Sequence, residues 1–291
     1  MSRIDIKESI DIFLCPICGK KMKAYGSGRI TCKNKHSFDL SRNGYVNLLL
    51  SPAKLDYDKN MLKSRSLICR SNFFRPMIDQ LSTLILKEKQ KENTDMLKIL
   101  DAGCGEGSHL AQITASISSN SSIKAKSFGI DISKDGIQLA SRDYPEIVWC
   151  VADLARLPFT GKRFDVILSI LSPSNYKEFN RVISHDGILV KVIPGNSYLK
   201  ELRILFYDRT DKETYSNDRV IEHFKSNFNI FNIQQLQYNM PIDKGNLVHL
   251  VKMTPLSWRA PSEKIENILS SGIDNITVDL SIIAGSKKKY Q

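Results

Sequence analysis

The spacing of apolar residues changes near residue 95. From residue 55 to about residue 91, apolar residues recur at intervals of three and four, as at Met61, Leu62, Leu81 and Leu84. This period is typical of an amphipathic helix. The pattern is interrupted near residues 72–76, so we expect helical structure with a break at that point.

From Met96 onward, short apolar runs alternate with segments of helical period. The expected strands are LKILDAG, KSFGIDIS, EIVWCVAD, FDVILSIL and GILVKVI, and the expected helices are SHLAQITASI, KDGIQLASRDY and NYKEFNRVI. Alternation of this kind predicts a parallel sheet covered by helices. Residues 231–240 and 275–285 are predicted as an antiparallel pair that closes one side of the sheet.

The N-terminal region contains a compact set of metal-binding residue types. Cys15 and Cys18 are separated by two residues, and Cys32 and His36 complete a stretch of 22 residues. Zinc takes four nitrogen or sulfur ligands, and a C-x2-C pair supplies two of them from one turn. A redox pair would lie beside a βαβ pattern, which does not follow here, and buried thiols are the other alternative. The spacing predicts a closed, structural zinc ribbon.

These patterns suggest three segments. The length of 291 residues suits two domains, or one large domain with an appendage. We expect a zinc-binding ribbon over residues 1–50, a linker and helical segment over residues 51–94, and a larger α/β domain over residues 95–291.

Positive charge is concentrated around the cysteines. The formal net charge is +11, and residues 15–70 hold twelve Lys or Arg against three Asp, a local balance of +9. A localised basic stretch is typical of a protein that binds a polyanion, although a solvated basic face is the simpler alternative. Because the stretch coincides with the predicted ribbon, we favour nucleic acid as the partner and the ribbon as the part that recognises it.

The N-terminus mixes charged and apolar residues, unlike a signal peptide, and no window approaches the ~20 apolar residues of a membrane span. These features predict a cytoplasmic protein without a membrane segment. Six cysteines in that compartment favour metal binding or free thiols over disulfides.

The most specific motif is ILDAGCGEGSHL at residues 99–110, which follows an expected strand and opens an expected helix. Gly103, Gly105 and Gly107 allow the backbone to turn tightly and to approach a ligand. A dinucleotide-binding loop would read G-x-G-x-x-G, and here the third glycine comes one residue early. Asp101, before the glycines, suits a ligand with an amino group rather than a pyrophosphate.

The motif D-x-G-x-G-x-G, followed by an acidic residue at the end of the next strand, resembles the class I S-adenosylmethionine-dependent methyltransferases. The resemblance implies a Rossmann-like α/β fold with a seven-stranded sheet and S-adenosylmethionine as cofactor. Within the motif it implies cofactor contacts for Asp101, Gly103, Gly105, Glu106 and Gly107. Asp131 would accept the ribose hydroxyls, Asp153 would contact the adenine amino group, and Leu154 would offer its backbone N–H to the adenine ring. The alternative is a Rossmann-like fold with a vestigial site.

Four further segments narrow the resemblance. They are GYVNLLL at residues 44–50, LSPS at 171–174, IPGNSYLKEL at 193–202 and MTPLSWRA at 253–260. Together with the ribbon they are similar to the large-subunit ribosomal RNA guanine-N1 methyltransferases, which modify a hairpin loop near the peptide exit tunnel and include macrolide-resistance enzymes.

That resemblance implies 23S ribosomal RNA as the substrate, zinc bound by the ribbon and a homodimer. It also implies that Phe74 and Tyr198 touch the cofactor. The chain departs from the family after the strand FDVILSI, where it has LSPSN and a family member has YAPC.

Methyl transfer to guanine N1 requires a general base, because neutral N1 carries a proton. The sequence does not identify this base, and the candidates for the catalytic site are Ser172, Asn175 and Arg65. Ser174 or Asn175 could equally cap the following helix, and Arg65 could be a surface cation. Two other functions stay open, namely a small-molecule methyltransferase and a non-catalytic zinc-ribbon protein that binds RNA.

Overall fold

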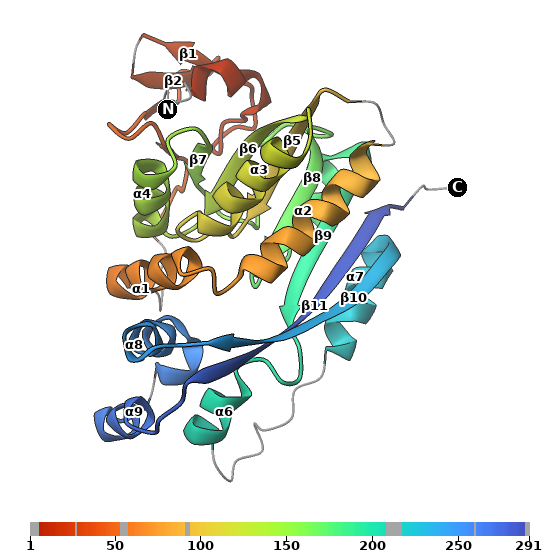
Figure 1. Cartoon of the computed structure of the whole chain (residues 1–291). Helices are drawn as coiled ribbons and strands as arrows, with labels where there is room; N and C mark the ends of the chain where they lie inside the picture. The colour runs from red at the N-terminus through yellow and green to blue at the C-terminus, as the bar shows by residue number, and fades with distance from the viewer. Residues whose placement is uncertain are drawn as a thin grey trace.

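The computed structural model describes residues 6–26, 28–52, 58–90, 94–207, 217–258 and 260–288. Helices cover both faces of one mixed β-sheet, and a small ribbon lies at one end of the molecule (Figure 1). Residues 1–5 of the predicted ribbon, residues 53–57 of the predicted linker and Arg259 of the MTPLSWRA segment lie outside the described residues.

The central sheet has eight strands in the order β10-β11-β9-β8-β5-β6-β7-β4. Neighbouring strands are parallel from β9 to β4, whereas β11 is antiparallel to both β9 and β10. The strands are β4 (Val46–Asn47), β5 (Met96–Ala102), β6 (Lys124–Asp131), β7 (Val148–Val151), β8 (Phe164–Ile170), β9 (Ile183–Pro194), β10 (Phe228–Pro241) and β11 (Asn275–Lys287). The predicted parallel sheet with an antiparallel closing pair is confirmed, with one strand more than the seven expected.

The extra strand is β4, which comes from the segment that follows the ribbon. Val46 pairs with Cys150 of β7 in parallel register and extends the sheet edge. The strand order reverses at β5, which lies between β8 and β6. Ligands of open α/β sheets bind at the carboxyl ends of the strands at such a reversal, so the end of β5 is the expected position of the site.

Local sequence signals mark the start of α1 and the break that follows it. Asp58 caps α1, because its Oδ1 accepts the Met61 N–H at 2.7 Å. The predicted break between the first two long helices is confirmed, with Asn72 at φ 64° and a proline in the first turn of α2. The described helices are η1 (Ile6–Ile12), α1 (Lys59–Arg70), α2 (Arg75–Lys89), α3 (Ser108–Asn120), α4 (Lys134–Asp143), α5 (Tyr176–Val182), α6 (Lys200–Tyr207), α7 (Asp218–Asn227), α8 (Lys244–Met253), η4 (Pro255–Ser257) and α9 (Ser262–Leu269).

Alternate residues of the central strands face two different apolar layers. Ile99 of β5 packs in the layer that includes residues of α1, α2, α3 and α8. Its neighbour Leu100 packs in the layer that includes residues of α5, α7 and the ribbon. The ribbon therefore covers part of one face of the sheet, as Figure 1 also shows for its position above β7.

The ribbon is a three-stranded antiparallel sheet of β1 (Met22–Tyr25), β2 (Arg29–Cys32) and β3 (Ser37–Asp39). It joins the larger domain through Phe13, whose ring lies 5.1 Å from the ring of Phe159 between centroids. On either side, the Leu14 N–H donates to the Pro158 carbonyl at 2.8 Å and the Thr160 N–H donates to the Ile12 carbonyl at 2.7 Å. The two parts share one apolar core. The segment boundaries at residues 50 and 94 stay a prediction.

None of the helices in the described part of the chain combines the length and the apolar character needed to span a membrane.

Candidate functional site

The four predicted zinc ligands lie together in the ribbon. Their ligand atoms are all within 4.8 Å of one another. The Cys15 Sγ and Cys32 Sγ lie 3.5 Å and 3.6 Å from the His36 Nδ1, and the Cys18 and Cys32 sulfurs are 3.6 Å apart. In a tetrahedral site, zinc–sulfur bonds of about 2.3 Å separate ligand atoms by roughly 3.7 Å. The donor set and its spacing fit a zinc ion.

The three glycines of the loop after β5 all have positive φ, and the space around them differs. Gly107, at φ 85°, opens α3, and a Cβ there would lie 2.5 Å from the Trp149 ring. A Cβ on Gly103 would lie 2.7 Å from the Ser172 Cβ. Gly105 has free space beside its backbone, since the nearest atoms to its Cβ position belong to Arg65 at 3.7 Å or more. The loop can therefore admit a ligand at Gly105.

Three carboxylates surround this loop. Asp101 at the end of β5 is 2% exposed, and its Oδ1 has no hydrogen-bond partner among the described residues. Asp131 at the end of β6 accepts the Gly105 N–H at 2.8 Å through Oδ2 and the Ser133 N–H at 2.7 Å through Oδ1. A carboxylate has about four acceptor sites, so Asp131 keeps acceptor capacity for a ligand. Glu106 is also buried, and its Oε2 accepts the Ser108 hydroxyl at 2.5 Å.

Burial raises the pKa of all three carboxyl groups. The pKa of Asp101 rises to about 7, because desolvation outweighs the attraction of Arg65. The pKa values of Asp131 and Glu106 rise for the same main reason. Buried carboxylates favour a ligand that brings positive charge or hydroxyl donors. S-adenosylmethionine offers an amino group, ribose hydroxyls and a sulfonium, so these residues fit it.

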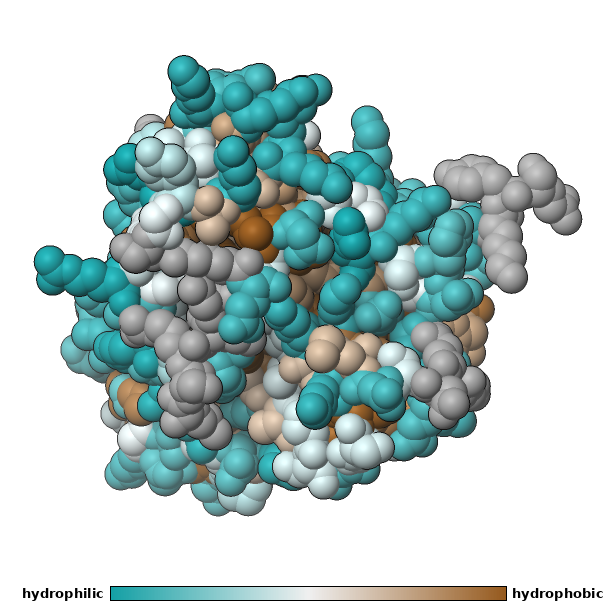
Figure 2. Space-filling model, turned by 90° about the horizontal axis from the view of Figure 1, so that it is seen from above, coloured by the Kyte–Doolittle hydropathy of each residue, from teal (hydrophilic) through white to brown (hydrophobic). Residues whose placement is uncertain are grey.

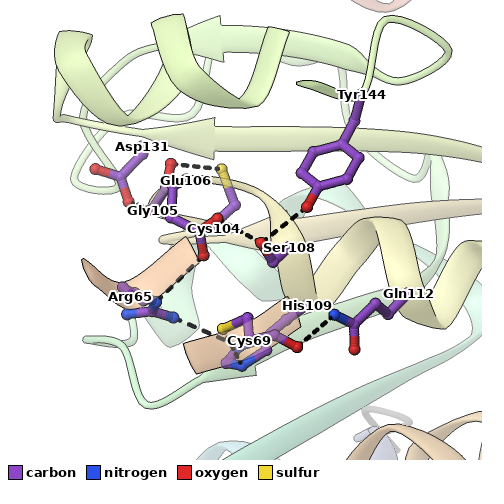
Figure 3. Close-up of polar contacts among 10 residues, drawn as sticks. All are labelled: Arg65, Cys69, Cys104, Gly105, Glu106, Ser108, His109, Gln112, Asp131 and Tyr144. Carbon is purple, nitrogen blue, oxygen red and sulfur yellow. Dashed lines mark hydrogen bonds and ion pairs between the residues drawn. The ribbon is translucent and has the colours of Figure 1, made fainter. Parts of the chain in front are cut away.

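Arg65 of α1 closes one side of the loop (Figure 3). Its Nε lies 3.6 Å from the Glu106 Oε1, and its guanidinium also reaches the His109 Nδ1 at 3.4 Å. His109 is buried in the first turn of α3, and burial lowers its pKa well below the usual range. Its Nε2 lies 3.5 Å from the Cys69 sulfur. Arg65 is thus a half-buried partner of the acidic loop, with a side chain that is 21% exposed, rather than a fully exposed surface cation.

The other predicted cofactor residues lie in different settings. Asp153 is exposed and accepts the Ala155 N–H at 2.8 Å. Leu154 is half-buried, with its Cδ1 3.8 Å from the Cβ position of Gly103. Phe74 is 1% exposed and packs edge-on against His109, with 5.1 Å between the ring centroids. Their roles stay predictions.

A cavity of ≈ 1020 Å³ opens at the carboxyl ends of β8 and β9. Its walls come from α1, the LSPS loop, the end of β9, α6, α7 and η4, and Tyr198 lines it as well. The basic residues in its wall are Arg65, Lys191, Arg203, Arg219 and His223. None of the described residues that line it is Asp or Glu. The cavity therefore suits an anionic substrate.

The structure separates the candidates that follow β8. Asn175 caps α5, since its Oδ1 accepts the Glu178 N–H at 3.2 Å, and it does not line the cavity. Ser172 does line the cavity, and its hydroxyl donates to the Ala102 carbonyl at 2.7 Å. The helix-cap alternative therefore holds for Asn175. Ser172 instead links the LSPS loop to the end of β5.

Sequence reasoning missed Lys191 of β9. This lysine is 5% exposed and lines the cavity. The signal was present, because a lysine in the apolar run GILVKVI is unusual in a buried strand. The cations Arg203 of α6 and Arg219 of α7 were also missed, since nothing in their local sequence places them beside the LSPS loop.

Comparison with known proteins agrees with this arrangement. A family model described as "RlmA, N-terminal", a zinc ribbon, matches residues 13–54, and a model described as "Methyltransferase domain" matches residues 99–187. YxjB of Bacillus subtilis (strain 168), which carries the name of a 23S rRNA (guanine-N(1)-)-methyltransferase, is 41% identical over 286 residues, covering 97% of this chain and 100% of YxjB. The chain belongs to this guanine-N1 methyltransferase family.

A second relative in the guanine-N1 methyltransferase family is the 23S rRNA (guanine(748)-N(1))-methyltransferase of Streptomyces fradiae. It is 27% identical over 282 residues, which cover 94% of this chain and 96% of the relative. Both matches run through the ribbon and the α/β domain, so the protein is an S-adenosylmethionine-dependent methyltransferase with a zinc-binding ribbon.

Proposed function

We propose that the protein transfers a methyl group from S-adenosylmethionine to N1 of a guanine in a hairpin loop of 23S ribosomal RNA. The observation that carries the proposal is the cation-lined cavity beside the glycine loop, in a chain whose relatives carry the names of 23S rRNA guanine-N1 methyltransferases. A base that is turned out of its stack can enter a cavity of this size with its phosphates near the arginines.

The charge of the cavity and of the ribbon favours RNA over a small apolar substrate. Lys20, Lys21, Lys23, Lys33 and Lys35 of the ribbon are all exposed. Figure 2 views the molecule from the end that carries the ribbon, and most side chains on this face are hydrophilic. A small-molecule methyltransferase would have no use for this basic ribbon.

The residues around the glycine loop hold the cofactor in this proposal. Asp131 binds the ribose hydroxyls, Asp153 and Leu154 bind the adenine, and Asp101 faces the amino group of the methionine moiety. Phe74 and Tyr198 complete the wall, the former by packing behind the loop. When bound, the cofactor supplies an activated methyl group. The chain then contributes mainly orientation, because the methyl carbon and guanine N1 must meet in line.

The direct test is methyl transfer to ribosomal RNA that lacks the modification. Labelled S-adenosylmethionine is incubated with large-subunit RNA from cells without this gene, and the product is read by primer extension. A methyl group on N1 blocks the pairing edge, so extension stops one base before the modified guanine. Label without such a stop would point to another atom, and no label in any RNA would favour the small-molecule alternative.

Binding of the cofactor product separates the enzyme from a non-catalytic RNA-binding protein. We expect S-adenosylhomocysteine to raise the melting temperature clearly, because ligand binding to the native state stabilises it. No shift at a saturating ligand concentration would support the non-catalytic alternative.

Cofactor affinity should depend on pH through Asp101. Its pKa is raised from 3.8 to about 7, so below pH 7 it must lose a proton to face a cationic amino group. We expect the affinity for S-adenosylhomocysteine to rise up to tenfold per pH unit below about pH 7 and to level off above pH 8. The stability of the protein without ligand should change with pH in the opposite direction. Between about pH 4 and pH 7, Asp101 of the unfolded chain loses its proton while native Asp101 keeps it, so the free energy of unfolding falls as pH rises. Calorimetric titration from pH 6 to pH 8 measures the affinity, and Asp101→Asn should flatten its dependence. An unchanged slope in that variant would contradict the assignment.

RNA binding should depend on salt through the ribbon lysines. The variant Lys20→Gln/Lys21→Gln removes two exposed charges, and we expect the slope of log Kd against log salt to fall by about 1 for each phosphate that the variant no longer neutralises. Filter binding at about 50–300 mM KCl measures the slope. The matched control is Lys87→Gln/Lys124→Gln, an equal charge change at exposed positions of α2 and β6. Equal slopes for both variants would remove the ribbon from the RNA interface.

The homodimer and the cytoplasmic location expected from the sequence remain proposals as well. Light scattering of the purified protein at several concentrations tests the first, and fractionation of cells tests the second.

A further inference from the structure

Lys191 lies between the glycine loop and the cavity. Its Nζ lies 3.1 Å from the Ser172 carbonyl, and the hydroxyl of the same serine donates to the Ala102 carbonyl of β5. Ser172 also abuts Gly103, where an added Cβ would lie 2.7 Å from its Cβ. One residue therefore separates Lys191 from the glycine loop, while Lys191 itself lines the cavity.

The surroundings of Lys191 are neutral and polar. Its Nζ contacts the Ser174 Oγ at 2.7 Å and the Ser169 Oγ at 3.3 Å. Hydroxyls can turn to donate or to accept, so they suit the amine as well as the ammonium form. Burial lowers the pKa of Lys191 to about 8, and no carboxylate opposes that effect.

The cavity offers few other groups that can accept a proton. Its described lining contains no Asp or Glu, and the side chains able to act as bases are Lys191, His223, Tyr176, Tyr198 and Tyr207. Burial raises the pKa of Tyr176 and Tyr198, which makes both poor proton acceptors near neutral pH. His223 is exposed on α7 and packs edge-on against Tyr176, with 4.8 Å between ring centroids. Among these cavity side chains, Lys191 is buried and its Nζ lies 3.1 Å from the carbonyl of Ser172, whose hydroxyl reaches the end of β5.

We propose that Lys191 is the general base that removes the N1 proton of the target guanine, with Ser174 and Ser169 holding its amine in place. The inference rests on the proposed function. During transfer a bond forms between the methyl carbon and guanine N1, and the carbon–sulfur bond breaks with its electron pair going to sulfur. The N1 proton passes to the neutral Nζ, which becomes an ammonium and later releases the proton to water.

Other titratable groups face the same space and must be distinguished from Lys191. They are Arg65 of α1, Tyr176 of α5, Tyr198 in the turn before α6, Arg203 and Tyr207 of α6, and Arg219 and His223 of α7. The arginines stay charged at all relevant pH values. Histidine titrates nearest neutral pH, so His223→Gln is measured alongside the Lys191 variants.

The test is the single-turnover rate of N1 methylation of a hairpin RNA from pH 6 to pH 9.5. We expect the wild-type rate to rise about tenfold per pH unit and to level off near pH 8. Lys191→Met should lower the rate 10²- to 10⁴-fold, an ordinary range for loss of a general base, and should remove the break near pH 8. The break should persist in His223→Gln. Lys191→Arg should be as inactive as Lys191→Met, because a guanidinium cannot accept the proton.

Chemical rescue separates a base from a structural role. Lys191→Ala should recover rate when methylamine or ethylamine is added, with a dependence on amine basicity. Melting temperature and S-adenosylhomocysteine affinity are measured for each variant. High activity in Lys191→Arg would overturn the proposal in favour of a fixed positive charge, and a wild-type pH profile in Lys191→Met would overturn it outright. No methylation by the wild-type protein would instead mean that the proposed function is wrong.

Discussion

Loss of the zinc ion is expected to destabilise the whole protein and not only its ribbon. Structural zinc sites contribute about 10–16 kcal/mol of apparent binding free energy, which is as large as the ~5–15 kcal/mol that stabilises a typical domain. The ribbon without zinc should therefore unfold. Its core continues into the core of the methyltransferase domain through Phe13 and Val46, both fully buried.

The same unfolding would uncover part of the sheet. Phe159 and Val148 lie in the layer that the ribbon covers, and exposure of such apolar side chains costs about 1.5–3 kcal/mol each. Scanning calorimetry of the zinc-loaded protein should show one cooperative transition. After chelation the melting temperature should fall by well over 10 °C, since about 1 kcal/mol shifts it by roughly 2–4 °C in a protein of this size.

Two single-cysteine variants, one inside the cluster and one outside it, provide a matched test of the zinc prediction. Cys32→Ala removes a ligand that is 2% exposed, while Cys150→Ala removes a thiol of β7 that is 1% exposed and outside the cluster. We expect loss of zinc and a large drop in stability for the first variant, and retained zinc with a small drop for the second. Similar stability of the two variants would show that the cluster is not a structural metal site.

Gly107→Ala is expected to have the second largest effect. Gly107 has φ 85°, and an alanine there would place its Cβ 2.5 Å from the Trp149 ring and 2.8 Å from the Ala140 Cβ. The left-handed conformation costs a non-glycine residue about 1–2 kcal/mol, and overpacking of a tight contact adds about 1–3 kcal/mol. The free energy of unfolding should therefore fall by roughly 2–5 kcal/mol.

The clash should also reach the cofactor. Relief requires α3 or the glycine loop to move away from Trp149, which shifts Gly105 and its hydrogen bond to Asp131. We expect at least a tenfold loss of affinity for S-adenosylhomocysteine, measured by calorimetry beside urea unfolding. Gly272→Ala is the control, because Gly272 has φ 76° but no atom within 4 Å of its Cβ position. The Gly272→Ala variant should lose only the about 1–2 kcal/mol that the left-handed conformation costs and should keep its affinity for S-adenosylhomocysteine. Equal losses in the two variants would mean that the contact with Trp149 is unimportant.

The sequence by itself determined the parts of the protein that depend on short-range geometry. Zinc ligands at Cys15 and Cys18 come from one turn, so their spacing along the chain already specifies the coordination. β5, the glycine loop and α3 likewise follow one another directly in the chain, and the glycines mark the turn between strand and helix. The order of apolar strands and helical segments was sufficient to predict the layered sheet.

Only the tertiary structure decided which side chains meet across the sheet. Lys191, Arg203 and Arg219 lie on different elements, and their convergence on one cavity follows from how β9, α6 and α7 pack. The local sequence around Asn175 is compatible with a helix cap and with a place in the site. The structure shows that Asn175 caps α5.

The position of the ribbon was decided in the same way. Phe13 is an ordinary apolar residue in the sequence, yet it joins the ribbon to Phe159. The physical reason is general. Periodicity specifies which face of an element is apolar, but the residues that cover this face come from distant parts of the chain, and only their packing settles whether a polar side chain ends in a core, at a surface or in a site.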